Sequence, residues 1–383
     1  MSRYSTMKSC LVAGLCLLAL AGTARANGSS NFNAGIAASQ RHAYGAAITF
    51  LTIALGEPDL PARLKAGALF ERGFAYCETG QYNDAIADLT QAIGLDPDHA
   101  DSFRERAKAY AREGQSDQAI ADETRALRLK RNDASLYSER ALLYLGRNRW
   151  RETIADFSAA IGLAPQNADL PFLRGHAFRL AGEPVRAVED ESRALALDPG
   201  LVDAREERAA AYEDQGEFGR ALDDYNAKLA RSDDTQVRFH IGIAEWYLGR
   251  YSDAAASFAE MLRRNPSDAN SMLWLTLARV GSGDRSLNQL EQSARPVDLR
   301  KWPGPIIAFY LQKSTLSQLL AIAQVGSPQR LALQRCDVNF YIGEWEIRGN
   351  PAMAKALFRQ SAVACPPNLV VRRAAAFELA RMH

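Results

Sequence analysis

The sequence has no excess of charge of either sign, because its 383 residues carry 46 lysine and arginine side chains against 45 aspartate and glutamate side chains. A chain so close to neutral generates no global positive field. This argues against a nucleic-acid partner and leaves any charged partner to a local patch. Apolar runs long enough to span a bilayer are absent after residue 26, so we expect no further segment that crosses a membrane.

Catalytic and metal-binding motifs are missing as well. The histidines stand apart and form neither an H-E-x-x-H motif nor a Cys/His pattern with zinc spacing. They are His42, His99, His176, His240 and His383. The sequence also lacks a G-x-S-x-G elbow, a G-x-x-x-x-G-K-[ST] loop and a G-x-G-x-x-G motif after a strand. We therefore expect a protein without enzymatic activity, cofactor or metal.

The first 26 residues differ from the rest of the chain. Arg3 and Lys8 precede the apolar run CLVAGLCLLALAG, and the run is followed by the small residues Ala24 and Ala26. This order is typical of a secretory signal peptide. We expect residues 1–26 to be removed and the mature protein to be soluble, secreted and periplasmic.

Alternatives for this segment stay open. A lipoprotein acylated on Cys16 is less favoured, because the bulky Leu15 stands where the lipoprotein peptidase needs a small residue. A buried first helix or a membrane anchor is also less favoured, and the apolar run is too short for a hydrocarbon layer of about 30 Å.

From residue 66 the sequence repeats with a constant period of about 34 residues. One column holds only residues without a bulky side chain: Gly73, Ala107, Ala141, Gly175 and Ala209. Three positions later stands a column of aromatic rings: Tyr76, Tyr110, Tyr144, Phe178 and Tyr212. A spacing of three puts both columns on one helical face, so we expect this face to be buried.

The second half of each repeat begins with a turn. Every repeat has a residue that tolerates positive φ four positions after its aromatic ring: Gly80, Gly114, Asn148, Gly182 and Gly216. A second helix follows, with small residues on the side that packs against the first. Pro97, Pro165 and Pro199 end this helix in three of the repeats. Asp88, Asp122 and Asp156 recur at the same period, and we interpret them as a solvated row.

This pattern resembles the tetratricopeptide repeat, and a sixth copy follows at Gly242, one position short of the regular spacing. One repeat cannot bury its own apolar face, so we predict an all-α, right-handed superhelical solenoid with a C-terminal capping helix. The expected divisions are a flexible lead at 27–35, a degenerate N-terminal repeat or cap at 36–65, six repeats at 66–267, and irregular helices with the cap at 268–381.

The C-terminal part carries a second resemblance. The order GIAEWYLGRY, LWLTLAR, a loop with Trp302, AFYLQ, NFYIGEW and a final Ala/Leu helix resembles the C-terminal half of the NlpI-type periplasmic lipoproteins, over roughly residues 236 to 381. The resemblance implies a homodimeric envelope adaptor that brings peptidoglycan hydrolases together with a protease. This chain departs from the family in lacking a convincing lipidation site.

Three cysteines follow the expected cleavage point. Cys336 precedes the first helix of the last predicted pair and Cys365 ends its second helix, so the two lie at neighbouring ends of a hairpin. We predict a disulfide between them, worth roughly 3 kcal/mol on the chain-entropy model. Cys77 would remain a free thiol near the groove.

The first helices should line a groove along the solenoid. Its predicted partner-binding residues are Phe70, Phe74, Arg104, Lys108, Arg112, His176, Arg179, Phe239 and Trp246. An acidic band of Glu206, Glu213 and Asp214 lies between Arg179 and Phe239. Such bands suit an extended or helical peptide anchored by aromatic contacts. The alternatives are that Arg104, Lys108 and Arg112 only solvate their helix, and that Phe239 and Trp246 are buried.

The favoured function is a non-catalytic scaffold or adaptor that binds protein or peptide partners in the cell envelope, with no metal or nucleic acid. A structural organiser that self-associates, for example as a homodimer near Trp302 or Phe239, is the first alternative. An enzyme acting on an envelope polymer is the second, and it would need a catalytic pair that the sequence does not provide.

Overall fold

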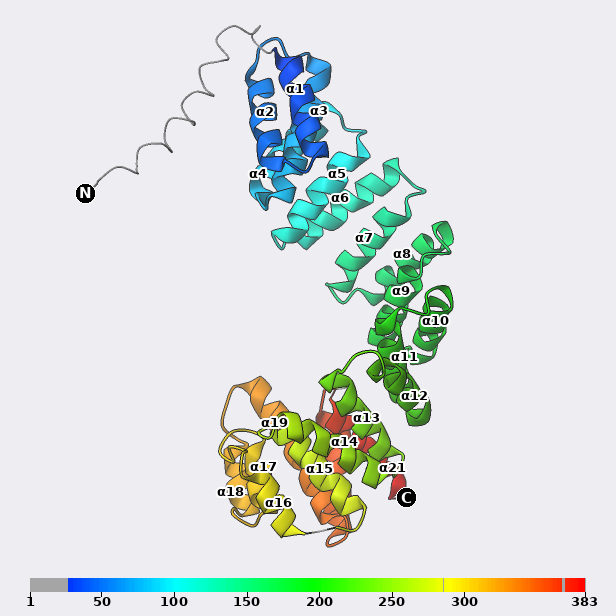
Figure 1. Ribbon diagram of the computed structural model, residues 1–383, viewed down its shortest axis with the longest axis vertical. Coiled ribbons are helices and arrows are strands. Elements are labelled where there is room, and N and C mark those ends of the chain that lie inside the picture. The colour runs from blue at the N-terminus through cyan, green and yellow to red at the C-terminus, as the bar shows by residue number, and fades with distance from the viewer. Residues whose placement is uncertain (1–26, 285, 367–368, 383) are drawn as a thin grey trace, which may run out of the picture. The chain divides into compact units, whose positions relative to one another are not determined.

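The computed structural model describes residues 27–284, 286–366 and 369–382, and these residues contain twenty-one α-helices and no β-strand (Figure 1). The helices form two compact units, divided between Ala181 and Gly182 in the sequence, and each unit is described by itself. The expected signal peptide at 1–26 and the alternative acylation site Cys16 lie outside the described residues. In the part of the chain that is described, no helix is long and apolar enough to cross a membrane.

Unit 1 consists of four helix pairs followed by a single helix. Its helices are α1 Gly28–Gln40, α2 Tyr44–Gly56, α3 Ala62–Glu78, α4 Tyr82–Leu95, α5 Ala100–Arg112, α6 Ser116–Leu129, α7 Ala134–Leu145, α8 Trp150–Leu163 and α9 Asp169–Leu180. The two helices of a pair pack against each other, and the second helix of each pair packs against the first helix of the next. This nearest-neighbour stacking is the arrangement of a helical solenoid.

The first pair begins earlier than the sequence suggested. We expected a flexible lead at 27–35, but Asn27 caps α1 by accepting a hydrogen bond from the backbone N–H of Ser30 at 2.9 Å, and the helix starts at the next residue. Gly35 on α1 faces the fully buried Leu51 on α2, where an added Cβ would lie 2.5 Å from the leucine Cγ. The expectation of a flexible lead is wrong, because these residues form the first helix of a complete pair.

The small-residue column and the turn column take the predicted roles. A Cβ added to Gly73 on α3 would lie 2.7 Å from Cγ of Leu89 on α4, so the missing side chain lets the two helices approach closely. The turn residues all have positive φ: Gly80 78°, Gly114 75°, Asn148 57°, Gly182 80° and Gly216 77°. Each of them ends a first helix in the left-handed conformation that glycine and asparagine accept.

A row of arginines on the first helices binds the aspartates of the second helices. Arg106 on α5 donates from Nε and Nη2 to the carboxylate of Asp122 on α6 at 2.7 and 2.8 Å, and from Nη1 to Thr90 on α4 at 3.0 Å. The same aspartate pairing recurs in unit 1 for Arg72 with Asp88 and Arg140 with Asp156. These aspartates are 4–7% exposed, so their interpretation as a solvated row is wrong.

Unit 2 continues with helix pairs and ends in a larger core. Its helices are α10 Pro184–Leu197, α11 Val202–Asp214, α12 Phe218–Leu229, α13 Thr235–Tyr247, α14 Tyr251–Arg264, α15 Ala269–Gly281, α16 Leu287–Ala294, α17 Gly304–Tyr310, α18 Leu316–Ile322, α19 Pro328–Glu346, α20 Pro351–Ala364 and α21 Val370–Arg381. The short helices α16 and α18 were not predicted. The arginine–aspartate pairing described for unit 1 recurs here between Arg208 and Asp224.

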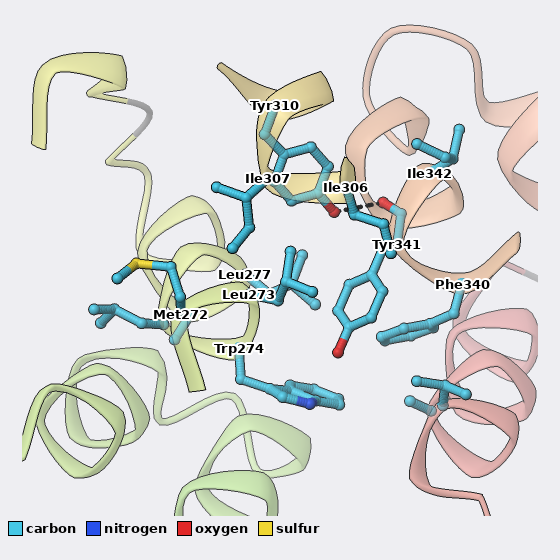
Figure 2. Packing of buried hydrophobic residues seen from close by; sticks show 14 of the residues in the cluster. Met272, Leu273, Trp274, Leu277, Ile306, Ile307, Tyr310, Phe340, Tyr341 and Ile342 are labelled. Atoms are coloured by element: carbon cyan, nitrogen blue, oxygen red, sulfur yellow. Dashed lines mark hydrogen bonds between the residues drawn. The ribbon is translucent and has the colours of Figure 1, made fainter. Parts of the chain in front are cut away.

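The larger core of unit 2 joins all the helices from α13 to α21. Figure 2 shows Trp274 of α15 facing Phe340 and Tyr341 of α19, with Ile306, Ile307 and Tyr310 of α17 on the opposite side of Leu273 and Leu277. The hydroxyl of Tyr310 donates to the carbonyl oxygen of Tyr341 at 2.7 Å, so the buried polar atom of this ring has a partner.

Cys336 and Cys365 are joined by a disulfide, with 5.7 Å between their Cα atoms. The pairing is the one that the sequence predicted, although Cys336 lies inside α19, which already starts at Pro328, and not before that helix. The bridge ties the middle of α19 to the end of α20.

Candidate functional site

The predicted groove residues of unit 1 lie on the side of the first helices that points away from the arginine row. On α5, Arg104 and Lys108 each lie two positions from Arg106, which places them about 160° around the helix from the side that binds α6. We call this surface of α3, α5, α7 and α9 the first-helix face of unit 1.

The aromatic band at the start of this face is half-buried. The Phe70 ring packs edge-on against His99 at a centroid distance of 4.8 Å, and Phe74 packs edge-on against Tyr44 at 6.0 Å. Phe70 also lines a cavity of about 340 Å³ that is bounded by α1, α3 and the connection between α4 and α5. Its other lining residues are Phe32, Ile36, Arg63, Ala66, Gly67, Glu71, Asp96 and His99. The cavity is large enough to accept one bulky side chain of a bound peptide.

Arg104 is engaged within the chain. Its Nε donates to Oε2 of Glu139 on α7 at 2.8 Å, and its Nη2 contacts Oε1 of the same carboxylate. Beneath this pair lies Glu123 of α6, which is 1% exposed, and one of its carboxyl oxygens has no hydrogen-bond partner. Burial, with a smaller contribution from the charge of Glu139, raises the pKa of Glu123 to about 9. Arg104 therefore links two repeats and is not a free cation.

Lys108 and Arg112 remain open to solvent on the same helix. Lys108 Nζ contacts Glu105 at 2.8 Å, but its side chain is still 44% exposed. Arg112 stands beside the exposed Glu113. Lys108 and Arg112 are therefore the two cationic side chains of α5 that keep exposed surface, whereas Arg104 is held in its ion pair with Glu139.

The first-helix face continues with an apolar band on α7 and a band of mixed polarity on α9. Leu142 on α7 is 45% exposed, and Leu145 beside it is half-buried. On α9, His176 and Arg179 are both half-buried. Unit 1 thus presents aromatic, basic and apolar side chains in the predicted order.

Cys77 lies on α3 between the aromatic and basic bands. Its Sγ lies 3.8 Å from the carbonyl oxygen of Glu105, and burial raises the pKa of the thiol to about 12. A thiol that stays protonated is a poor nucleophile. Among the described residues, no group of three or more His, Cys, Asp or Glu side chains is arranged to hold a metal ion.

In unit 2 the predicted aromatic band is covered. Trp246 on α13 is 3% exposed, and its ring packs against Trp274 at 5.5 Å and Phe377 at 6.2 Å. Phe239 is half-buried and packs edge-on against Phe258 at 5.8 Å. The assignment of Trp246 to an open groove is wrong, because α15 and the C-terminal helix α21 enclose it.

Trp302, the other residue considered for self-association, also has a hydrogen-bond partner within the chain. Its indole Nε1 donates to Oδ2 of Asp337 at 2.8 Å.

The acidic band of unit 2 is occupied as well. Arg373 on α21 donates to Asp214 Oδ1 at 2.7 Å and to Glu213 Oε2 at 3.1 Å, both on α11. Sequence reasoning treated α21 only as a cap for the last core face and missed this contact. The signal in the sequence was the series Arg373, Phe377 and Arg381, which puts three large side chains on one helical face at intervals of four.

Comparison with known families matches the repeats directly. A family model described as TPR repeat matches residues 73–114, and a second, described as tetratricopeptide repeat, matches residues 138–202 and 239–284. The matched segments include all of the helices α4, α5, α8, α9, α10, α14 and α15.

Three solved structures are similar to this chain at low sequence identity. The chain is similar to a tetratricopeptide repeat protein from Parabacteroides merdae, with 17% identity, a TM-score of 0.48 and coverage of 66% of this chain and 98% of that chain. It is similar to the MamA protein, with 20% identity, a TM-score of 0.43 and coverage of 45% and 93%. It is also similar to YrrB, described as a TPR protein with an unusual peptide-binding site, with 19% identity, a TM-score of 0.43 and coverage of 48% and 95%.

Proposed function

This chain is a tetratricopeptide repeat protein, and we propose that it works as an exported, non-catalytic adaptor that binds protein or peptide partners in the cell envelope. The observation that carries the proposal is the first-helix face of unit 1, where the exposed cations Lys108 and Arg112 stand between aromatic and apolar side chains. A partner with acidic groups and one or two bulky apolar anchors would complement this face.

The cavity beside Phe70 strengthens this choice of partner. It combines the aromatic rings of Phe32 and Phe70 with the polar groups of Arg63 and His99, a mixture that suits an anchored side chain flanked by hydrogen bonds. The nearby carboxyl of Glu71 has its pKa raised by burial, and a hydrogen bond from Ser39 partly opposes this.

Export and the envelope setting rest on the sequence of residues 1–26 and on the resemblance of the C-terminal part to the NlpI-type lipoproteins. That resemblance also motivates the finer proposal that peptidoglycan hydrolases are among the partners. Mass spectrometry of the mature protein tests whether the chain is exported and how its N-terminus is processed. An N-terminus at Asn27 supports a cleaved, unanchored protein, an acylated Cys16 indicates a membrane tether, and an uncleaved Met1 contradicts export.

Binding is tested by affinity capture from envelope extract with the full chain and two variants. The test variant is Lys108→Glu with Arg112→Glu, and the matched control is Arg128→Glu with Arg131→Glu, which changes the charge by the same amount at two other exposed arginines. We expect specific partners to be recovered by the wild type and the control and lost with the test variant. Recovery of the same partners by all three proteins would contradict the assignment of this face.

The non-catalytic part of the proposal has its own test. Zymography of the purified protein against peptidoglycan should show no lysis, and lysis bands from co-captured partners should disappear with the Lys108→Glu, Arg112→Glu variant. Lysis by the purified chain itself would contradict the adaptor role.

A further inference from the structure

Helix α21 packs against α20 and α19, and its side chains Arg373 and Phe377 reach the face of α11 and α13 that corresponds to the first-helix face of unit 1. Asp214 on α11 stands in the same repeat column as Arg112 on α5, three repeats apart. In unit 2 this column is not open, because Arg373 of α21 forms ion pairs with Asp214 and with the adjacent Glu213. The contact joins residues separated by 159 and 160 positions in the sequence.

An aromatic contact follows one helical turn later. The ring of Phe377 packs edge-on against Tyr247 on α13 at 4.8 Å, and it lies 6.0 Å from Phe218 at the start of α12. Tyr247 and Phe218 are themselves stacked at 3.9 Å, so they offer a preformed aromatic surface. One further turn along α21, Arg381 donates to the hydroxyl of Tyr251 at 3.2 Å. Figure 1 shows α21 in red beside α13.

We propose that this surface of α11 and α13 is a docking site for an amphipathic helix that carries arginine and an aromatic residue one turn apart, and that α21 is its built-in, displaceable occupant. A partner helix with the pattern Arg-x-x-x-Phe would compete with α21 for Glu213, Asp214 and the stacked pair of Phe218 and Tyr247. The inference rests on the adaptor function proposed above and names a second binding site with a different partner chemistry.

Charge complementarity supports this choice of occupant. The acidic pair on α11 needs a cation that can reach two carboxylates, and arginine provides donors for both. The neighbouring aromatic surface then requires a ring four residues further along the same helix. An acidic peptide, which suits unit 1, would be repelled here.

The contact of α21 is imperfect, which is why it can be displaced. The Tyr247 hydroxyl and Glu344 Oε1 are buried at or near this interface without a hydrogen-bond partner in the described part of the chain, and Glu213 Oε1 has only His240 Nδ1 beside it, at 3.4 Å. Burial first, and the charge of Glu378 on α21 second, raise the pKa of Glu344. Buried polar groups without partners weaken the docked state relative to the open one, in which water can reach them. In addition, the first turn of α21 has no side-chain cap.

The test uses the full chain and a fluorescent peptide of residues 369–382. In the chain, Phe377→Ala weakens the docking of its own α21 and leaves the surface of α11 and α13 intact. We expect the peptide to bind this variant at least tenfold more tightly than the wild-type chain. The matched control is Ala376→Gln, at an exposed position of the same helix, which should bind the peptide as weakly as the wild type.

A charge exchange tests the arginine site. Asp214→Arg in the Phe377→Ala chain should weaken binding of the wild-type peptide, and a peptide with Arg373→Asp should recover part of that loss. A structural defect in the chain would not be repaired by changing the peptide. Equal binding of the peptide to wild type and Phe377→Ala, or no binding to a Phe377→Ala chain with unchanged helix content, would overturn the proposal.

Hydrogen exchange in the wild-type chain gives an independent measurement that needs no variant. The amides of α21 should exchange at least tenfold faster than those of the central turns of α19, because opening of α21 leaves the contacts of α19 with α15 and α17 in place. Exchange of α21 as slow as that of α19 would mean a permanent cap and would overturn the inference. Either failure leaves the unit 1 capture experiment unaffected, so the adaptor function and this site can fail separately.

Discussion

Phe377, close to the C-terminal end of α21, packs edge-on against Tyr247 with 4.8 Å between ring centroids and an interplanar angle of 87°. This contact closes the aromatic band of unit 2, whereas the corresponding band of unit 1 keeps half-buried rings beside a cavity. The same repeat therefore presents two kinds of surface, one available to a partner and one held by the chain's own last helix.

The hydroxyl of Tyr247 predicts an unusual result for a conservative change. It is buried without a hydrogen-bond partner, so Tyr247→Phe should leave the free energy of unfolding unchanged or raise it by about 0.5–1 kcal/mol. Tyr310→Phe is the matched control, because that hydroxyl donates to Tyr341, and we expect it to lose about 1–2 kcal/mol. Denaturant unfolding of both variants checks the difference, and equal losses would contradict it.

The ion pair of Arg106 and Asp122 should matter more than an ordinary surface salt bridge. Arg106→Ala leaves a buried carboxylate without its partner, and we expect a loss of about 3 kcal/mol in the free energy of unfolding. Arg128→Ala, at an exposed position on α6, should change it by less than about 0.5 kcal/mol. Similar values for the two variants would show that the pair contributes no more than an exposed one.

Glu123 predicts a pH dependence of stability. Its pKa is about 9 in the folded chain and near 4.5 when unfolded, so the folded state binds the proton more tightly. The contribution of protonated Glu123 to the free energy of unfolding is fully present below pH 4.5 and is lost as the pH rises towards 9. The free energy of unfolding should fall by at most about 1.4 kcal/mol per pH unit over this range.

Glu123→Gln should flatten this decline, so its melting temperature should exceed that of the wild type at pH 8 and approach it at pH 5. Glu113→Gln, at an exposed site, serves as the control and should follow the wild type. A constant difference between Glu123→Gln and wild type across this range would show that Glu123 does not titrate as described.

Two glycines in neighbouring helices should respond in opposite directions to alanine. Gly73→Ala places a Cβ 2.7 Å from Leu89 Cγ and should cost about 1–3 kcal/mol by overpacking. Gly94→Ala on α4 meets nothing within 4 Å and should stabilise by up to about 1 kcal/mol through helix propensity. Thermal unfolding of the two variants measures both changes, and a loss at Gly94 would argue against the packing described for α4.

The disulfide between Cys336 and Cys365 should stabilise unit 2 by about 3 kcal/mol, since it joins residues with a sequence separation of 29. We expect Cys336→Ser with Cys365→Ser to lower the unfolding midpoint, and Cys77→Ser to leave the response to reductant unchanged. Detection of Cys336 and Cys365 as free thiols, by peptide mapping of protein kept in oxidising conditions, would contradict the bridge.

The repeat made most of the fold predictable from the sequence. A constant period fixes which residues share a helical face, so the roles of Gly73 and Gly80 followed from spacing alone, whereas in the aromatic column Phe178 and Tyr212 are buried and Tyr76 is only half-buried. The start of α1 could not be found in this way, because Asn27 and the glycine and serine residues after it resemble a linker by composition. What makes them helical is the cap at Asn27 and the packing of Gly35 on Leu51.

The binding face was harder to predict than the fold. Helical spacing placed Arg104, Lys108 and Arg112 together, but it could not show that Arg104 binds Glu139 of the next repeat. It left open whether Trp246 lies in the groove or is buried, since the contact with Phe377 that encloses it joins helices far apart in the sequence. Periodicity reports on neighbours within a repeat, and these contacts depend on tertiary packing.

The arginine row has a consequence for the length of such a protein. Each arginine binds an aspartate sixteen residues after it, and Arg106, Arg140 and Arg208 also bind a hydroxyl sixteen residues before them. Duplication or deletion of a block of one whole period would keep each arginine in register with its aspartate and its hydroxyl partner. The solenoid can therefore gain or lose repeats by recombination of its gene without needing a new kind of interface between repeats.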